Sequence, residues 1–249
     1  MSKIFDALRK AEQNSVELVV PPLEGGTPGT EAHPREVRLQ ETEFSRLSSA
    51  VISSFTRVKE GRIVLVVGAA VREGATYVTA HLGQALAAGC GGDVLCLDGN
   101  FHDPSLARHT GAKSGLGLTD VAENGYTREL ASVIQPGDTN NLFVVTPGRK
   151  RLSSVAFFDS PQFDAMLAEM RRTFRFTLVD GPPLLAYPDS IHLAARVDGI
   201  LLVVRQGRLK REVLQKAMDP LQSQDAPMLG VVLNRRRFAI PHFVYKLIS

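Results

Sequence analysis

Six short, nearly continuous apolar runs recur along the chain, and they constrain its fold more than any other feature. Longer segments between them show the 3.6-residue spacing of amphipathic helices. Strands buried on both faces of a parallel sheet have this apolar character, and strand–helix alternation favours right-handed crossovers. We therefore predict an α/β fold, a doubly wound, mostly parallel sheet flanked by helices. The predicted strands are residues 62–67, 93–98, 142–147, 176–180, 199–204 and 228–234, and the clearest helices are 76–88 and 161–174.

The segment VVGAAVREGATYVTAHLGQALA, residues 66–87, begins as an apolar strand, opens into a short loop and continues as a helix. This is the layout of a phosphate-binding loop, in which the backbone N–H groups at a helix N-terminus face an anion. Such loops read Gly-Lys-Ser/Thr at the start of the helix. Here the same positions read Gly74, Ala75 and Thr76.

Two of the predicted strands end in aspartate, Asp98 and Asp180. Ligands of doubly wound sheets bind outside the carboxyl ends of the strands, so residues at these positions are the informative ones. Aspartate also commonly caps the turn after a strand, and this structural interpretation stays open. Two carboxylates beside a phosphate-binding loop nevertheless favour a magnesium–nucleotide site.

Composition and charge place few further limits. The chain has 249 residues, of which 44% are hydrophobic and 22% charged, as in ordinary globular proteins. A net charge of +3 is too mild to indicate nucleic-acid binding, and no apolar run approaches the roughly 18–20 residues of a membrane span. The first residues have no long apolar stretch of a secretion signal, and the two cysteines, Cys90 and Cys96, fit no zinc pattern. We expect a cytoplasmic protein.

The two ends of the chain differ from the middle. Residues 2–13 place Ile4, Leu8 and Ala11 on one helical face, and the Pro- and Gly-rich segment VVPPLEGGTPGTEAHP follows. We predict a short helix plus linker over residues 1–40 and one α/β domain over residues 41–249. Residues 235–249 are basic, with three arginines, a lysine and no acidic side chain. They are interpreted either as a solvated turn and terminal helix or as a peripheral contact with an anionic membrane.

Residues 41–240 resemble the bacterial tyrosine kinases of capsule and exopolysaccharide synthesis (BY-kinases), a family within the MinD/ParA-like P-loop proteins. VLCLDGNFHDPSL resembles the family's second aspartate motif, and FTLVDGPPLLAYPDSIHLAARVDGILLVVR resembles its Walker B strand with the helix and strand that follow. MLGVVLNRRR resembles the final strand, whose asparagine approaches adenine. The segments GLGLTDVAENG and MSKIFDALRKAEQ are similar to further family segments. The resemblance implies a P-loop NTPase fold of the MinD and BY-kinase type for residues 41–249.

The resemblance also implies a site. In the family the loop lysine offsets the charge of the β- and γ-phosphates, and the hydroxyl after it is a magnesium ligand. Carried over by position, Asp98 and Asp180 are the catalytic residues of an active member, and Thr76, Asp98 and Asp180 are the magnesium ligands. The nucleotide-binding positions are Gly68, Arg72, Gly74, Ala75, Thr76, Tyr77 and Asn234.

The departures from the family pattern lie where the chemistry would occur. Ala75 replaces the lysine and Tyr77 the threonine that follows the hydroxyl residue, and the loss of one such electrostatic contact typically costs about 3–4 kcal/mol of transition-state stabilisation. Arg72 in the loop and Arg205 at a strand end could swing toward a phosphate, although exposed loop arginines are common. Further departures are Asn100, His102 and Asp103, where the family has an aspartate and two basic residues, and Gly181 in place of Ser or Thr.

Two family features of assembly and phosphorylation are weakened as well. The oligomerisation motif Glu-x-x-Arg-x-x-Arg is reduced to Glu43, Arg46 and Ser49. The family's C-terminal tyrosine cluster is reduced to Tyr245, which we interpret as an anchoring or packing residue. Both differences weaken the expectation of a ring of kinase subunits that phosphorylate one another.

We therefore expect a degenerate BY-kinase-like protein, a pseudokinase that regulates or scaffolds the synthesis of exopolysaccharide or another envelope polysaccharide. Mg-ATP or Mg-ADP would bind weakly or not at all. The expected partner is an envelope polysaccharide co-polymerase or a true kinase of the same pathway, at the inner face of the cytoplasmic membrane. No nucleic-acid partner is expected.

Three alternatives remain open at this stage. The first is an active ATP-dependent tyrosine autokinase with a variant loop. The second is a MinD-like positioning module that binds the membrane through residues 235–249. The third is a purely structural protein whose former nucleotide pocket is filled by Tyr77 and its neighbours.

Overall fold

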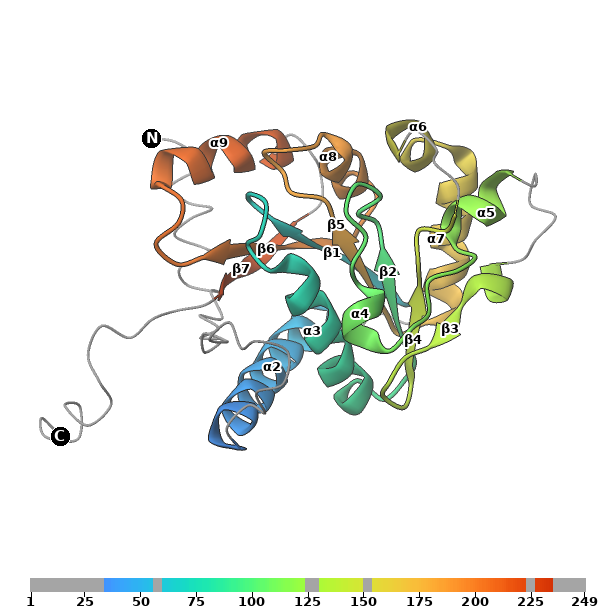
Figure 1. Ribbon diagram of the computed structural model, residues 1–249, viewed down its shortest axis with the longest axis horizontal. Coiled ribbons are helices and arrows are strands. Elements are labelled where there is room, and N and C mark those ends of the chain that lie inside the picture. The colour runs from blue at the N-terminus through green and yellow to red at the C-terminus, as the bar shows by residue number, and fades with distance from the viewer. Residues whose placement is uncertain (1–33, 56–59, 124–129, 150–153, 223–226, 235–249) are drawn as a thin grey trace, which may run out of the picture.

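A computed structural model describes residues 34–55, 60–123, 130–149, 154–222 and 227–234 of the chain. Its described strands form a seven-stranded sheet, in which every neighbouring pair is parallel except the short antiparallel pair at one edge (Figure 1). The predicted fold class is confirmed. The strands are β1 (Arg62–Gly68), β2 (Val94–Asp98), β3 (Gln135–Pro136), β4 (Leu142–Val145), β5 (Phe176–Gly181), β6 (Gly199–Arg205) and β7 (Met228–Asn234), in the order β3-β4-β2-β5-β1-β6-β7.

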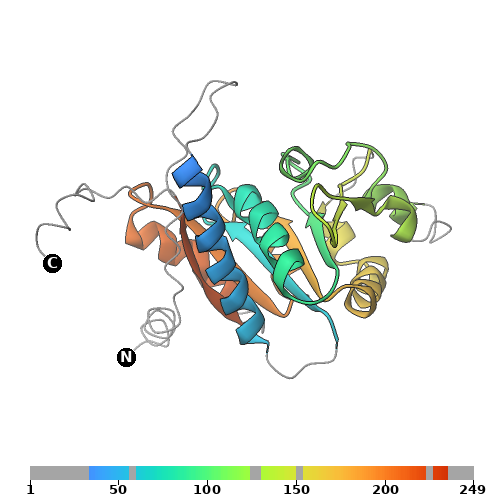
Figure 2. The ribbon, with the colours of Figure 1, turned by 90° about the horizontal axis from the view of Figure 1, so that it is seen from below.

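Helices cover both faces of the sheet. Figure 2 shows α2 (Pro34–Ser54) and α3 (Ala75–Gly89) side by side over one face. The larger helices α7 (Pro161–Thr173) and α9 (Arg211–Gln222) pack on the other face. The remaining short helices are α4 (Ala107–Thr110), α5 (Leu118–Glu123), η1 (Leu130–Val133), α6 (Ser154–Phe158) and α8 (Asp189–Ala194).

The central strand β1 explains why the strands read as continuous apolar runs. Residues Ile63–Val67 are all 0% exposed. Successive side chains of a strand point to opposite faces, so Ile63, Leu65 and Val67 enter the core beneath α7 and α9, whereas Val64 and Val66 enter the core beneath α2 and α3. Both faces of β1 are therefore apolar, and burial of this kind contributes roughly 25 cal/mol per Å² of apolar surface.

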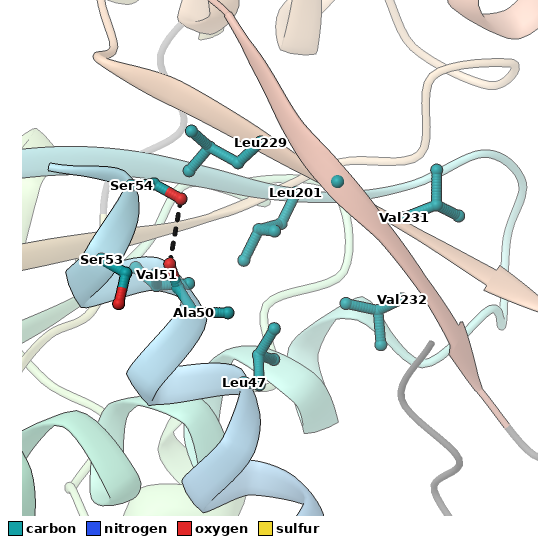
Figure 3. Close-up of a pocket in the computed structure, with 10 residues that line it drawn as sticks. Leu47, Ala50, Val51, Ser53, Ser54, Leu201, Leu229, Val231 and Val232 are labelled. Atoms are coloured by element: carbon teal, nitrogen blue, oxygen red, sulfur yellow. Dashed lines mark hydrogen bonds between the residues drawn. The ribbon is translucent and has the colours of Figure 1, made fainter. Parts of the chain in front are cut away.

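Helix α2 is amphipathic, and its apolar side packs on the face of the sheet that it shares with α3. Leu47 and Val51 face Leu201 and Val232 across an apolar hollow of about 390 Å³ between α2 and β7 (Figure 3). On the exposed side, Arg46 Nη1 donates to Glu43 Oε1 at 3.0 Å. The two residues that match the oligomerisation motif thus bond to each other.

The structure adds details that the sequence pattern did not predict. Strand β3 has two residues, one of which is Pro136, and it pairs antiparallel to β4. Helix α2 begins at Pro34, ahead of the predicted boundary at residue 41, and the division into domains stays a prediction. The predicted helix over residues 2–13 and the basic segment 235–249 lie outside the described residues. Within the described part of the chain, no helix combines the length and the apolar character that crossing a membrane requires.

Candidate functional site

The loop between β1 and α3 turns sharply at the carboxyl edge of the sheet. Arg72 and Gly74 both have positive φ, 61° and 92°. At Gly74 only glycine fits, because a Cβ there would lie 2.2 Å from Nδ2 of Asn234. That nitrogen donates to the carbonyl of Glu73 at 2.7 Å. The side chain of Asn234, at the end of β7, therefore holds the loop in place through this hydrogen bond.

The buried side chain of Glu73 fastens the same loop to the end of β6. Glu73 is 1% exposed, and its Oε2 accepts a short hydrogen bond from the backbone N–H of Arg205. Burial raises the pKa of Glu73, although this hydrogen bond and the charges of Arg208 and Arg205 act in the opposite direction. The loop is thus held by β6 and β7 together.

Helix α3 starts directly after this loop, with Gly74 as its N-cap residue. Gly74 supplies no side-chain cap, and the first turn contains no acidic residue. The first N–H groups of a helix have no intrahelical acceptor, and the helix dipole adds about half a positive charge at this end. The start of α3 therefore offers an anion site built from backbone alone.

Asp98 and Asp180 are register partners at the ends of the neighbouring strands β2 and β5, and each is 1% exposed. One oxygen of Asp98 accepts hydrogen bonds from the N–H groups of Ser105 and Leu106, both at 3.1 Å. Thr79 donates to Oδ1 of Asp180 at 3.4 Å, and the nearby Thr76 hydroxyl acts to lower the pKa of Asp180. The predicted juxtaposition of two carboxylates and a threonine hydroxyl is thus present in the fold.

Electrostatics in this pair favour protonation. Burial raises the pKa of Asp98 to about 6, against the effect of its backbone hydrogen bonds. Burial, together with the charge of Asp98, raises the pKa of Asp180 well above its ordinary value. Two carboxylates close together cannot both ionise without a compensating cation.

The Oδ2 atom of Asp180 is buried and has no hydrogen-bond partner among the described residues. An orphaned carboxylate oxygen beside Thr76 fits a hard divalent cation, and Mg²⁺ is usually held by one or two carboxylates plus phosphate oxygens. The described residues contain no cluster of three His, Cys, Asp or Glu side chains suited to a metal. Thr76, Asp98 and Asp180 thus fit magnesium only as partners of a bound phosphate.

A cavity of about 480 Å³ opens in front of the loop and the start of α3. Asp98 and Asp180 lie outside its lining but contact Ser105 and Thr76, which belong to it. The lining residues are Gly68, Ala70, Val71, Arg72, Glu73, Gly74, Ala75, Thr76, Asn100, Asp103, Ser105, Gly181, Pro183, Tyr187 and Arg208.

Three candidates from the sequence, Tyr77, Arg205 and Asn234, do not line this cavity. The Tyr77 ring turns toward α2, with its centroid 4.1 Å from that of His81 and 6.1 Å from that of Phe44. It therefore does not fill the cavity, and the idea of a pocket blocked by Tyr77 is wrong. Arg205 contributes its backbone N–H to Glu73.

The cavity also contains residues that the sequence did not single out. Arg208, from the turn after β6, lines it directly. The Tyr187 ring, at the rim, stacks on His102 with a centroid distance of 3.7 Å, and Nε2 of His102 lies 3.1 Å from Oδ2 of buried Asp189. These contacts join loops far apart in the sequence, so no local motif could have revealed them.

No family model matches the chain. Among curated proteins, the chain is 25% identical to the tyrosine-protein kinase CpsD of Streptococcus agalactiae over 178 residues, 71% of this chain and 76% of that protein. It is 24% identical to the tyrosine-protein kinase YwqD of Bacillus subtilis over 181 residues, 73% of this chain and 75% of that protein.

Solved structures show the same architecture. The kinase domain of VpsO matches with a TM-score of 0.70 and 24% identity, covering 82% of this chain and all of that chain. The kinase domain of the Escherichia coli tyrosine kinase ETK matches with a TM-score of 0.71 and 20% identity, covering 93% and 96%. The Mg-ADP complex of MinD from Pyrococcus horikoshii matches with a TM-score of 0.60 and 22% identity, covering 76% and 77%. The predicted resemblance to bacterial tyrosine kinases and MinD-like P-loop proteins is confirmed.

Proposed function

We propose that this relative of the bacterial tyrosine kinases is a non-catalytic regulatory or scaffolding component of exopolysaccharide or other envelope polysaccharide synthesis. The observation that carries the proposal is the cavity in front of α3. The start of α3 lines this cavity and Asp98 and Asp180 lie behind the lining, while Ala75 stands where the family resemblance places a phosphate-binding lysine. A site of this kind binds a Mg-nucleotide weakly and supplies little stabilisation to transferred phosphoryl charge.

The charge around the cavity supports this proposal. Arg72 and Arg208 are the cations of its lining, and Glu73 and Asp103 are the acids. The side chains of the lining thus carry as many acids as cations and include no lysine. Phosphoryl transfer spreads negative charge over the transferred group, and this lining offers little net positive charge to offset it.

The neighbouring acidic loop supports the same conclusion. The side chain of Asn100 forms hydrogen bonds within a local turn. Its Oδ1 accepts from the N–H of Asp103 at 3.2 Å, and its Nδ2 donates to the carbonyl of Asp103 at 3.3 Å. His102 faces Asp189. Asn100 lines the cavity without contributing a charge, and His102 does not belong to the lining. We infer that the protein acts by contact with an envelope polysaccharide co-polymerase or with a true kinase, at the inner face of the cytoplasmic membrane.

A complementation experiment tests this function. Deletion of the gene in its source bacterium is expected to reduce the exopolysaccharide or envelope polysaccharide produced, measured as polymer-bound sugar per cell. Asp180→Asn is expected to restore production as well as the wild-type gene does, because a scaffold needs no phosphoryl transfer. Matched protein levels on immunoblots serve as the control. Restoration by the wild type alone, at equal protein levels, would contradict the proposal, and so would unchanged polymer after deletion.

A further inference from the structure

The loop that faces the cavity contains no lysine from Gly68 to Tyr77. Its backbone N–H groups still attract an anion, but partial charges alone hold phosphate loosely. If a nucleotide binds, a side chain from elsewhere in the fold has to offset its phosphate charge. Among the residues that line the cavity, the side chains that could supply this positive charge are Arg72 and Arg208.

Arg208 is fixed against the phosphate-binding loop. It lies in the turn after β6, in which Gly207 adopts a φ of 73°. Because β6 pairs with β1 in parallel, this turn and the loop after β1 meet at the same edge of the sheet. Nη1 of Arg208 donates to the carbonyl of Arg72 at 3.1 Å. The guanidinium is thereby held across the loop, at the wall of the cavity.

The charge of Arg208 remains available to an anion. Its Nε lies 3.9 Å from Oε1 of Glu73, which is beyond hydrogen-bonding distance. Glu73 Oε1 has no hydrogen-bond partner among the described residues, and burial raises the pKa of this carboxyl. The ion pair between Arg208 and Glu73 is therefore weak, and 34% of the Arg208 side chain is exposed to solvent.

Arg72 is the weaker candidate. In its hydrogen bond with Arg208, Arg72 takes part through its backbone carbonyl, whereas Arg208 takes part through its guanidinium group. Ordering a free arginine side chain costs conformational entropy that a guanidinium already held in place has largely lost. Arg208 therefore offers planar, multiple N–H donors to a phosphate at lower cost.

We propose that Arg208 is the phosphate-binding cation of this site and takes over, for a nucleoside di- or triphosphate, the charge that Ala75 cannot supply. The inference deepens the proposed nucleotide binding and rests on it. Arginine can bind phosphate through two parallel hydrogen bonds, whereas lysine acts as a point charge. Binding through Arg208 provides affinity without placing a lysine at the reacting phosphates, consistent with a site that holds nucleotide but does not turn it over.

The test is a titration of the purified chain with a fluorescent Mg-ATP analogue at low salt. Arg208→Ala is expected to weaken binding about tenfold, the usual size of a charge-assisted hydrogen bond. Arg211→Ala, which removes the same charge from an exposed position outside the cavity lining, is expected to leave affinity unchanged. A fluorescent adenosine analogue without phosphates should bind both variants as it binds the wild type. Ala75→Lys in the Arg208→Ala background is expected to restore binding.

Three results would overturn the inference. They are equal affinity of Arg208→Ala and wild type for the Mg-ATP analogue, an equal loss for the adenosine analogue, and a loss confined to Arg72→Ala. Absence of analogue binding by the wild type at millimolar concentration would also overturn it, while leaving a purely scaffolding function intact. Phosphoryl transfer by the wild type would instead contradict the proposed function and leave the assignment of Arg208 standing.

Discussion

Replacing Ala75 by lysine is expected to tighten Mg-ATP binding by about ten- to a hundredfold. Ala75 is the first residue of α3, is half-buried and lines the cavity, so a lysine there projects toward a bound phosphate. A hydrogen bond to a charged group contributes about 1.5–3 kcal/mol, which corresponds to this range of affinity. Isothermal titration calorimetry of the two proteins with Mg-ATP measures the change.

The matched control is Ala88→Lys, which adds the same charge at an exposed position of α3. It lies thirteen residues further along the helix, about 20 Å from Ala75 at 1.5 Å per residue. Equal tightening in both variants would show a general charge effect and contradict the role assigned to position 75. An unchanged affinity of Ala75→Lys would show that the loop no longer presents this position to phosphate.

Asp180→Asn is expected to stabilise the protein without ligand or magnesium by about 1–3 kcal/mol at pH 7.5, the typical cost of a buried polar atom left without a hydrogen-bond partner. Burial and the charge of Asp98 raise the pKa of Asp180, so at neutral pH folding either protonates this carboxyl or buries its charge. Asparagine has the same shape, needs no protonation and can donate to Asp98. At about 2–4 °C per kcal/mol for a chain of this size, thermal unfolding resolves the gain.

The effect of Asp180→Asn on the free energy of unfolding should depend on pH. A carboxyl whose folded pKa is raised binds its proton more tightly in the folded than in the unfolded state, so stability falls as pH rises from near 4. For Asp98 the fall extends to a pH of about 6, and the raised pKa of Asp180 adds a fall in the same direction. The gain from Asp180→Asn should therefore be small at pH 4 and grow toward pH 7.5. Asp219→Asn, an equal charge change at an exposed residue of α9 outside the cavity lining, is the control, and a pH-independent gain or a loss at pH 7.5 would refute the explanation.

The sheet could be predicted from the sequence because its central strands are buried on both faces. Each of the six apolar runs corresponds to a strand, and Asp98 at the end of β2 pairs with Asp180, the next-to-last residue of β5. Strand β3 escaped prediction because two residues, one a proline, carry no periodicity and suit only a sheet edge.

The residues that line the cavity could not all be predicted, because the order of the strands in the sheet decides which loops meet there. Arg208 bonds to Arg72 across 136 residues, a contact created by the pairing of β6 with β1. Glu73 sits in the predicted loop, but its burial against the end of β6 has no signature in sequence. Tyr77 was placed in the site because it follows Thr76, whereas the helical turn directs its ring toward His81 under α2.

Transfer of radiolabelled phosphate from Mg-ATP, to the chain itself or to water, tests the central claim most directly. The assay compares the wild type with Asp98→Ala and Asp180→Ala, and a purified bacterial tyrosine kinase confirms that the conditions support transfer. The predicted result is that the wild type and both variants show the same background. Wild-type transfer that either substitution abolishes would show an active kinase or ATPase and contradict the account.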